Sequence, residues 1–148
     1  MFTEPLADGK NFLHVSVITV RDPVFLKWIG GEPHLWKREM ASLGELPAEQ
    51  RPFISVISLW EVAVLFELGR WNVAIPFEAW LKPACHPRTV EILPITQEIA
   101  AEVARLPTTF HRDPTDRIIV STARVRDIPL FTRDHRILNA RLTKKWAM

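Results

Sequence analysis

The sequence has almost no cysteine, and it lacks any long uninterrupted apolar stretch. Its single cysteine, Cys85, excludes an internal disulfide framework and suits a reducing compartment, so we expect a cytoplasmic protein. No apolar run approaches the roughly 20 residues that a membrane-spanning helix needs. Residues 1–10 are mixed and polar, and we expect no secretory signal there. The sequence also has no Gly-rich phosphate loop and no G-x-S-x-G nucleophile elbow.

The length and charge are those of an ordinary globular protein. With 148 residues, the chain is most simply one domain, 1–148, with an irregular lead-in at 1–12. The net charge is only +2, but basic residues crowd the last third of the chain and can attract a polyanion. On charge alone, a solvated helix face with a basic tail is the simpler explanation.

Apolar segments with strand and helix patterns alternate along the chain. Short runs rich in Val, Ile and Phe predict strands at 13–20, 53–57, 90–93 and 128–131. Helical patterns fall at 23–29, 33–43, 58–68, 76–81, 96–106 and from 114 onward. This alternation predicts an α/β fold in which a parallel sheet is covered by helices on both faces.

Two helix starts carry acidic residues. Asp113 can cap a helix in which Pro114 takes the first position and Asp116 the third. Ser58 and Glu61 have capping-box spacing, which predicts that a second helix begins there.

Acidic side chains follow the predicted strands and are candidates for one acidic pocket. In an open parallel sheet, ligands bind outside the carboxyl ends of the strands. Carboxylates without a Cys or His ligand set favour a hard ion, Mg²⁺ or Mn²⁺, and such ions promote phosphodiester hydrolysis. Alternatively, each acid only offsets a helix dipole. The candidates are Asp22, Glu61, Asp113, Asp116 and Asp134.

Other polar and aromatic residues give weaker signals. Cys85-His86 lacks partners at zinc spacing. His111 and His135 flank the acidic motifs and are candidates for a phosphate contact, although exposed loop histidines are common. Core or partner-facing packing explains the tryptophans better than base stacking.

Three segments form a distinctive combination: 54–61 (ISVISLWE), 111–123 (HRDPTDRIIVSTA) and 129–134 (PLFTRD). Together they resemble the PIN-domain family, and within it the VapC-type toxins of bacterial toxin–antitoxin pairs. The resemblance implies a three-layer α/β/α sandwich and a Mg²⁺- or Mn²⁺-dependent ribonuclease. It also implies a homodimer held inactive by a cognate antitoxin. Glu61, Asp116 and Asp134 fall on the family's acidic positions, and Asp113 on an additional acid of the same loop.

The sequence departs from the family pattern at two positions. The first strand of the family ends in an aspartate that binds metal, but Arg21 falls on this position, and Asp22 replaces it only if the register slips by one residue. A lysine often found one helical turn after the family's glutamate is here Leu65.

Three hypotheses follow for the function. The leading one is a ribonuclease toxin that holds metal with Asp22, Glu61, Asp116 and Asp134, assisted by Asp113. Arg112, Arg117 and Arg133 would then position the RNA substrate. The second is a catalytically degenerate PIN domain that binds an antitoxin-like partner or RNA without cleaving it. The third is an assembly module whose acids only cap helices.

Overall fold

The structure, a computed structural model, describes residues 17–18, 51–132 and 134–145. The predicted helices at 23–29 and 33–43 lie outside these residues, as do Asp22 and most of the predicted strand at 13–20. No helix within the described ranges is long and apolar enough to cross a membrane.

The described strands form one parallel sheet in the order β3-β2-β1-β4. Ile18 of the first strand lies opposite Ile54 of β2 on one side and opposite Phe131 of β4 on the other. The predicted parallel sheet is therefore confirmed, although β2, β3 and β4 are each shorter than the apolar run that predicted them. The strands are β1 (Val17–Ile18), β2 (Phe53–Ser55), β3 (Glu91–Leu93) and β4 (Leu130–Phe131).

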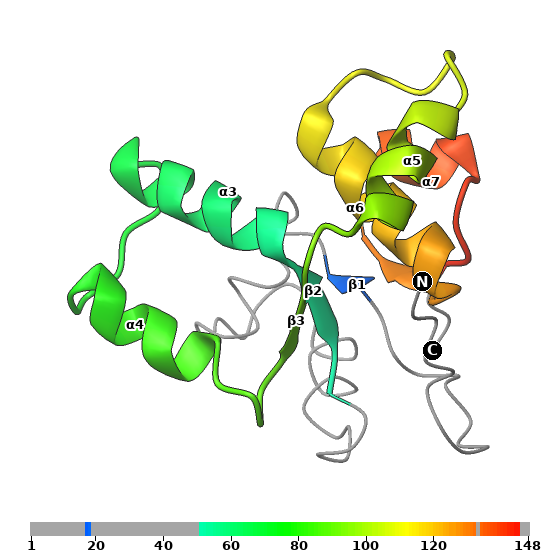
Figure 1. Ribbon diagram of the computed structural model, residues 1–148. Coiled ribbons are helices and arrows are strands. Elements are labelled where there is room, and N and C mark those ends of the chain that lie inside the picture. Colours follow the sequence, from blue (N-terminus) through cyan, green and yellow to red (C-terminus); the bar gives the residue numbers. More distant parts are fainter. Residues whose placement is uncertain (1–16, 19–50, 133, 146–148) are drawn as a thin grey trace.

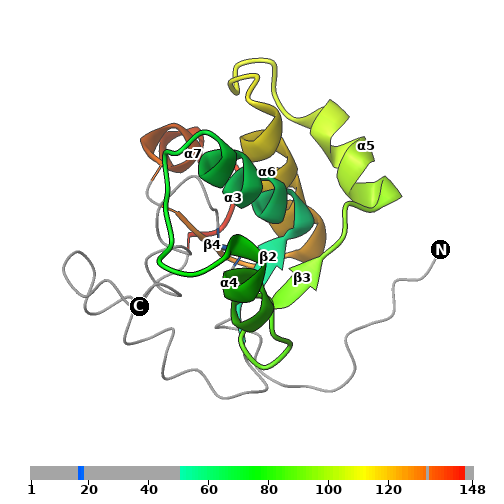
Figure 2. The same ribbon diagram turned by 90° about the vertical axis from the view of Figure 1, so that its left-hand side faces the viewer.

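Helices cover both faces of this sheet (Figures 1 and 2). Successive strand residues point to opposite faces, and here Phe53 and Leu130 join one apolar cluster whereas Ile54 and Phe131 join another. The predicted three-layer α/β/α sandwich is confirmed. One face carries α3 (Val56–Glu67) and α4 (Phe77–Ala84), and the other carries α5 (Gln97–Arg105), α6 (Pro114–Arg126) and α7 (His135–Ala140).

Helix α3 begins earlier than the sequence pattern predicts. Ser55, the last residue of β2, caps it, because its Oγ accepts a hydrogen bond from the backbone N–H of Ile57 at 3.3 Å. The predicted capping box of Ser58 and Glu61 is therefore wrong, and Ser58 is fully buried inside the helix. Packing of α3 against β2 and α6 outweighs the strand preference of Val56 and Ile57.

Aromatic side chains join α3 to α4. Gly69, with a φ of 64°, follows the end of α3 and turns the chain as predicted. The rings of Trp71 and Trp80 then meet edge to face with centroids 4.5 Å apart. Trp80 is buried as expected, but α4 continues past its predicted end at Leu81 to Ala84, which is buried in the same cluster as Trp80.

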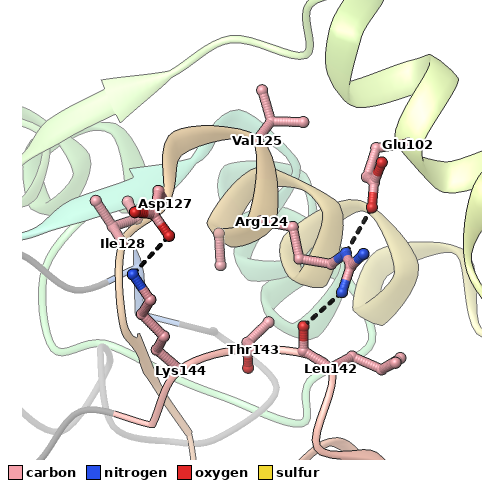
Figure 3. A pocket seen from close by; sticks show the side chains of 9 residues that line it. Glu102, Arg124, Val125, Asp127, Ile128, Leu142, Thr143 and Lys144 are labelled. Atoms are coloured by element: carbon pink, nitrogen blue, oxygen red, sulfur yellow. Dashed lines mark hydrogen bonds and ion pairs between the residues drawn. The ribbon is translucent and has the colours of Figure 1, made fainter.

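The segment after α7 is fastened beside β4. Arg124 of α6 contacts Glu102 of α5 at 2.5 Å and donates a hydrogen bond to the carbonyl of Leu142 at 2.8 Å (Figure 3). The N–H of Leu130 donates to the carbonyl of Lys144, also at 2.8 Å. Helix α5, helix α6 and the C-terminal segment are thereby tied to one edge of the sheet.

The core assignment predicts how two isoleucines respond to truncation. Ile119 of α6 is fully buried, so Ile119→Ala should lower the free energy of unfolding by about 2–5 kcal/mol. Ile75 is 50% exposed, and Ile75→Ala should change it by about 0.5 kcal/mol or less. Urea unfolding measures both, and equal effects would contradict the assigned core.

Candidate functional site

The strand order brings the carboxyl ends of β2, β1 and β4 side by side. The chain adds strands in one direction from β1 to β2 to β3 and then places β4 on the opposite side of β1. Ligands bind at such switch points, outside the carboxyl ends of the strands. Asp134 follows β4, and Glu61 lies on the helix that follows β2. Strands β2, β1 and β4 therefore lie side by side, which is the condition for the predicted acidic residues to meet at one site.

Asp113 caps helix α6 as predicted. Its Oδ1 accepts hydrogen bonds from the backbone N–H groups of Thr115 at 3.1 Å and Asp116 at 3.3 Å. Pro114 occupies the first helical position, where its missing N–H is not needed. The cap fixes the backbone of the first turn and with it the position from which the Asp116 side chain projects.

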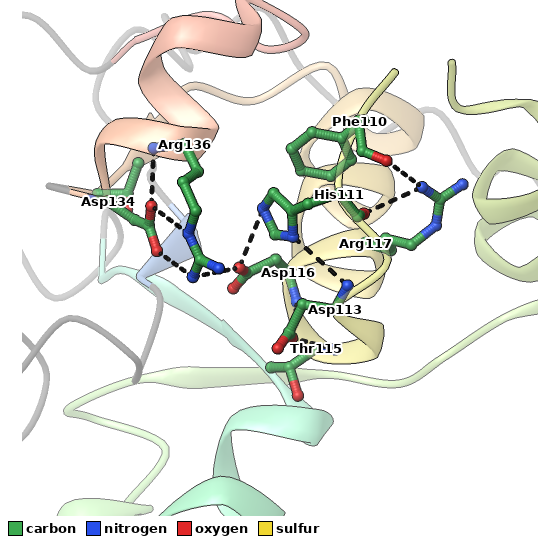
Figure 4. Close-up of polar contacts among 9 residues, drawn as sticks. Phe110, His111, Asp113, Thr115, Asp116, Arg117, Asp134 and Arg136 are labelled. Carbon is green, nitrogen blue, oxygen red and sulfur yellow. Dashed lines mark hydrogen bonds and ion pairs between the residues drawn. The ribbon is translucent and has the colours of Figure 1, made fainter. Parts of the chain in front are cut away.

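The carboxylate of Asp116 is completely buried beside two cationic or potentially cationic side chains. Its exposed fraction is 0%, and its Oδ2 lies 3.3 Å from His111 Nε2 and 3.4 Å from Arg136 Nη2 (Figure 4). The Nδ1 of His111 accepts the backbone N–H of Asp113 at 3.4 Å. In its neutral form His111 therefore carries its proton on Nε2, which faces Asp116.

Asp134 is the N-cap of α7, one position before the first helical residue, His135. Its Oδ1 accepts the backbone N–H of Arg136 at 2.8 Å, and its Oδ2 lies 2.9 Å from Arg136 Nη2. These hydrogen bonds, that of the guanidinium first, lower the pKa of the Asp134 carboxyl. Asp134 therefore stays ionised.

Arg136 joins the two aspartates, and the sequence reasoning did not place it in the site. Its Nη2 contacts Oδ2 of both Asp134 and Asp116, and the two carboxylates raise the pKa of the guanidinium (Figure 4). The spacing Asp134-x-Arg136 at a helix start is a weak local signal for the contact between Arg136 and Asp134. The contact with Asp116, from a different helix, has no signal in the sequence.

The arginines predicted to contact RNA lie in different settings. Arg117 is only 7% exposed and donates hydrogen bonds to the backbone carbonyls of Phe110 and Val103, at 3.2 and 3.1 Å, which argues against a contact with RNA. It instead fastens the loop before α6 to the end of α5. Arg112 is exposed on that same loop, and Arg133 lies outside the described residues.

Glu61 lines a pocket of about 570 Å³ together with Asp113. The Oε2 of Glu61 is buried, and the largely apolar wall includes Trp60 and Leu65. Leu65, where the family often has lysine, thus contributes apolar surface beside the acids.

The donor set suits a hard divalent cation. Carboxylate oxygens are the ligands that Mg²⁺ and Mn²⁺ prefer. Within the described ranges, no group of three or more His, Cys, Asp or Glu is arranged to hold a metal ion. The Arg136 guanidinium nevertheless acts as a stand-in, because it shows that one cation reaches both Asp116 and Asp134.

Comparisons with known proteins agree on a single family. The sequence model of the PIN-domain family matches residues 24–142. This range begins after Arg21 and Asp22, so the match does not test the role of Asp22. Ribonuclease VapC22 of Mycobacterium tuberculosis is 36% identical over 115 residues, which are 77% of this chain and 85% of that protein.

Two solved structures share the fold. VapBC2 from Rickettsia felis, bound to a DNA fragment from its promoter, superposes with a TM-score of 0.64 at 15% identity, covering 90% of this chain and 99% of that one. A toxin–antitoxin complex from Klebsiella pneumoniae gives 0.54 at 23% identity, covering 80% and 87%.

The lowered pKa of Asp134 predicts a pH-dependent contribution to stability. Because the folded-state pKa lies below the unfolded value of about 3.9, the stabilisation is present above that value and is lost as the pH falls through the folded pKa. Urea unfolding of the metal-free wild type and Asp134→Asn should give a stability difference that is constant near neutrality and shrinks below about pH 4. Asn retains the cap, so a pH-independent difference would contradict the ion pair.

Proposed function

We propose that this chain, which belongs to the PIN-domain family, is a metal-dependent ribonuclease and the toxin of a toxin–antitoxin pair. The observation that carries the proposal is the buried Asp116 carboxylate, which shares one cation with Asp134 at the switch point of the sheet. Buried carboxylates are costly unless a cation compensates them. Two carboxylates that share one cation at such a switch point support metal-dependent phosphodiester chemistry.

Asp116 and Asp134 are the proposed core of a Mg²⁺ or Mn²⁺ site. Glu61 from α3 and Asp22 complete the proposed ligand set, and Asp113 assists by fixing the first turn of α6. When bound, the ion supplies Lewis acidity that activates water and offsets negative charge on the phosphate. The protein itself holds the carboxylates in place through the caps of α6 and α7.

The remaining polar residues orient the acids and the substrate. The Nε2 of His111 faces Asp116 and restrains that carboxylate from the loop before α6. Arg112, exposed on the same loop, is placed to attract an RNA phosphate, and Arg133 is proposed for the same role beside Asp134. Arg117 is left out because its guanidinium is buried and bonded to backbone carbonyls.

A protein antitoxin is the proposed partner. The two solved structures of similar fold are, by their descriptions, a toxin–antitoxin complex and a VapBC protein. Helix α3 and its C-cap expose large apolar side chains, with Trp60 59% and Leu68 58% exposed, and such surface marks protein-binding sites. A homodimer stays a prediction from the family resemblance.

A catalytically degenerate PIN domain is the alternative. The observation that favours it is the arginine already present between Asp116 and Asp134, which neutralises part of their charge. A degenerate domain would bind a partner or RNA yet fail to take up metal. Metal binding by the purified chain separates the two functions.

Cleavage of a mixed RNA pool in the presence of Mn²⁺ tests the proposed function. Asp116→Asn should reduce cleavage by about 100-fold or more, because the variant loses a charged ligand of the proposed metal ion. Asp127→Asn is the matched control, since Asp127 is an exposed residue at the other end of α6 in a left-handed conformation that Asn accepts.

Asp22→Asn separately tests whether Asp22 belongs to the site. Cleavage that persists in a chelator, or that is equal in wild type and Asp116→Asn, would contradict the proposed ribonuclease.

A further inference from the structure

We propose that Arg136 is a built-in competitor of the metal ion, which holds Asp116 and Asp134 together in the metal-free protein and must leave when the ion binds. This inference rests on the proposed metal site. It adds a residue of this chain that sets how tightly the site takes up metal.

The geometry places the guanidinium where a shared ion would lie. A single atom, Arg136 Nη2, is 2.9 Å from Asp134 Oδ2 and 3.4 Å from Asp116 Oδ2 (Figure 4). These two oxygens face each other across the guanidinium of Arg136. An ion that coordinates both of them therefore cannot share the space with this nitrogen.

The arginine is able to leave because water reaches its side chain in the folded protein. Its side chain is 53% exposed, whereas that of Asp134 is 16% exposed and that of Asp116 is 0% exposed. Exposed ion pairs are weak, since water solvates the released guanidinium. By contrast, Arg117 is buried and donates hydrogen bonds to backbone carbonyls, so it cannot move without leaving those carbonyls unsatisfied.

Charge explains why the site needs such a residue. Without a cation, Asp116 would place a negative charge in the interior within reach of a second carboxylate, and like charges that meet without compensation are costly. Arg136 supplies one positive charge to the two acids and so lets the metal-free chain fold around them. A divalent ion supplies two, which favours the exchange once the ion is available.

The experiment is calorimetric titration of the metal-free protein with Mn²⁺, comparing wild type with Arg136→Gln. The affinity should become roughly 5- to 30-fold tighter in the variant, the factor that corresponds to losing both ion pairs of a half-exposed arginine. Arg136→Lys retains the charge and should bind within about threefold of wild type. Arg105→Gln is the matched control, because Arg105 is 74% exposed and pairs only weakly, at 4.0 Å, with Glu102.

Thermal unfolding gives a second readout that does not depend on activity. Metal-free Arg136→Gln should melt below wild type because its acids lose their internal cation, and excess Mn²⁺ should raise its melting temperature by more than it raises that of wild type. A variant that is merely damaged would lose stability with and without metal alike.

The outcomes distinguish this inference from the proposed function. Mn²⁺ binding by wild type with equal or weaker binding by Arg136→Gln would overturn the competition while the metal-dependent ribonuclease stands. No Mn²⁺ binding by either protein would overturn both. Binding by the variant alone, or much tighter binding by the variant, would support the competition.

Discussion

The buried carboxylate of Asp116 is the constraint on which the arrangement of this site depends. An ionised group with no exposed surface needs opposite charge and hydrogen-bond donors close by, and the fold supplies them from separate segments. His111 comes from the loop before α6 and Arg136 from α7, beyond the last strand. The caps made by Asp113 and Asp134 fix the starts of α6 and α7. Asp116 and Asp134 therefore face one cation, the guanidinium of Arg136.

The sheet explains why such distant segments meet. Because β1 lies between β2 and β4, the chain enters the sheet at its centre and returns to the opposite side only after α6. The carboxyl end of β4 is thereby carried next to the start of α6, and Asp134 comes within reach of the cation that Asp116 contacts. Phe53 and Ile54 are both buried but belong to different apolar clusters, one on each face of the sheet, so that both helical layers pack on it.

Local sequence signals were reliable where the interaction itself is local. The helix cap at Asp113 could be predicted from the sequence, since the N–H groups that donate to its carboxylate lie two and three residues further along the chain. The start of α3 was mispredicted, because both Ser55 and Ser58 are plausible caps and only the end of β2 decides between them. Arg117 resembled an RNA-binding residue by charge, and only the fold shows that backbone carbonyls surround it. Arg136 was missed because its second carboxylate lies 20 residues away, on another helix.

The arginine in the acidic site changes how the departures from the family pattern are interpreted. Arg21 falls on the family's aspartate position in the sequence, but within the described residues it is Arg136 that places a positive charge between the carboxylates. An arginine whose side chain is 53% exposed is compatible with a working site, because its ion pairs are weak enough for a divalent ion to displace it. The acidic site is then one with two states, closed on Arg136 or open to a divalent ion.

A crystal structure of the protein grown with Mn²⁺, with the ion located by its anomalous signal, tests this account most directly. The account predicts an anomalous peak within coordinating distance of both Asp116 and Asp134, with the Arg136 guanidinium moved away from Asp116. A peak at a different place, or no peak with Arg136 still between the two carboxylates at saturating Mn²⁺, would contradict it.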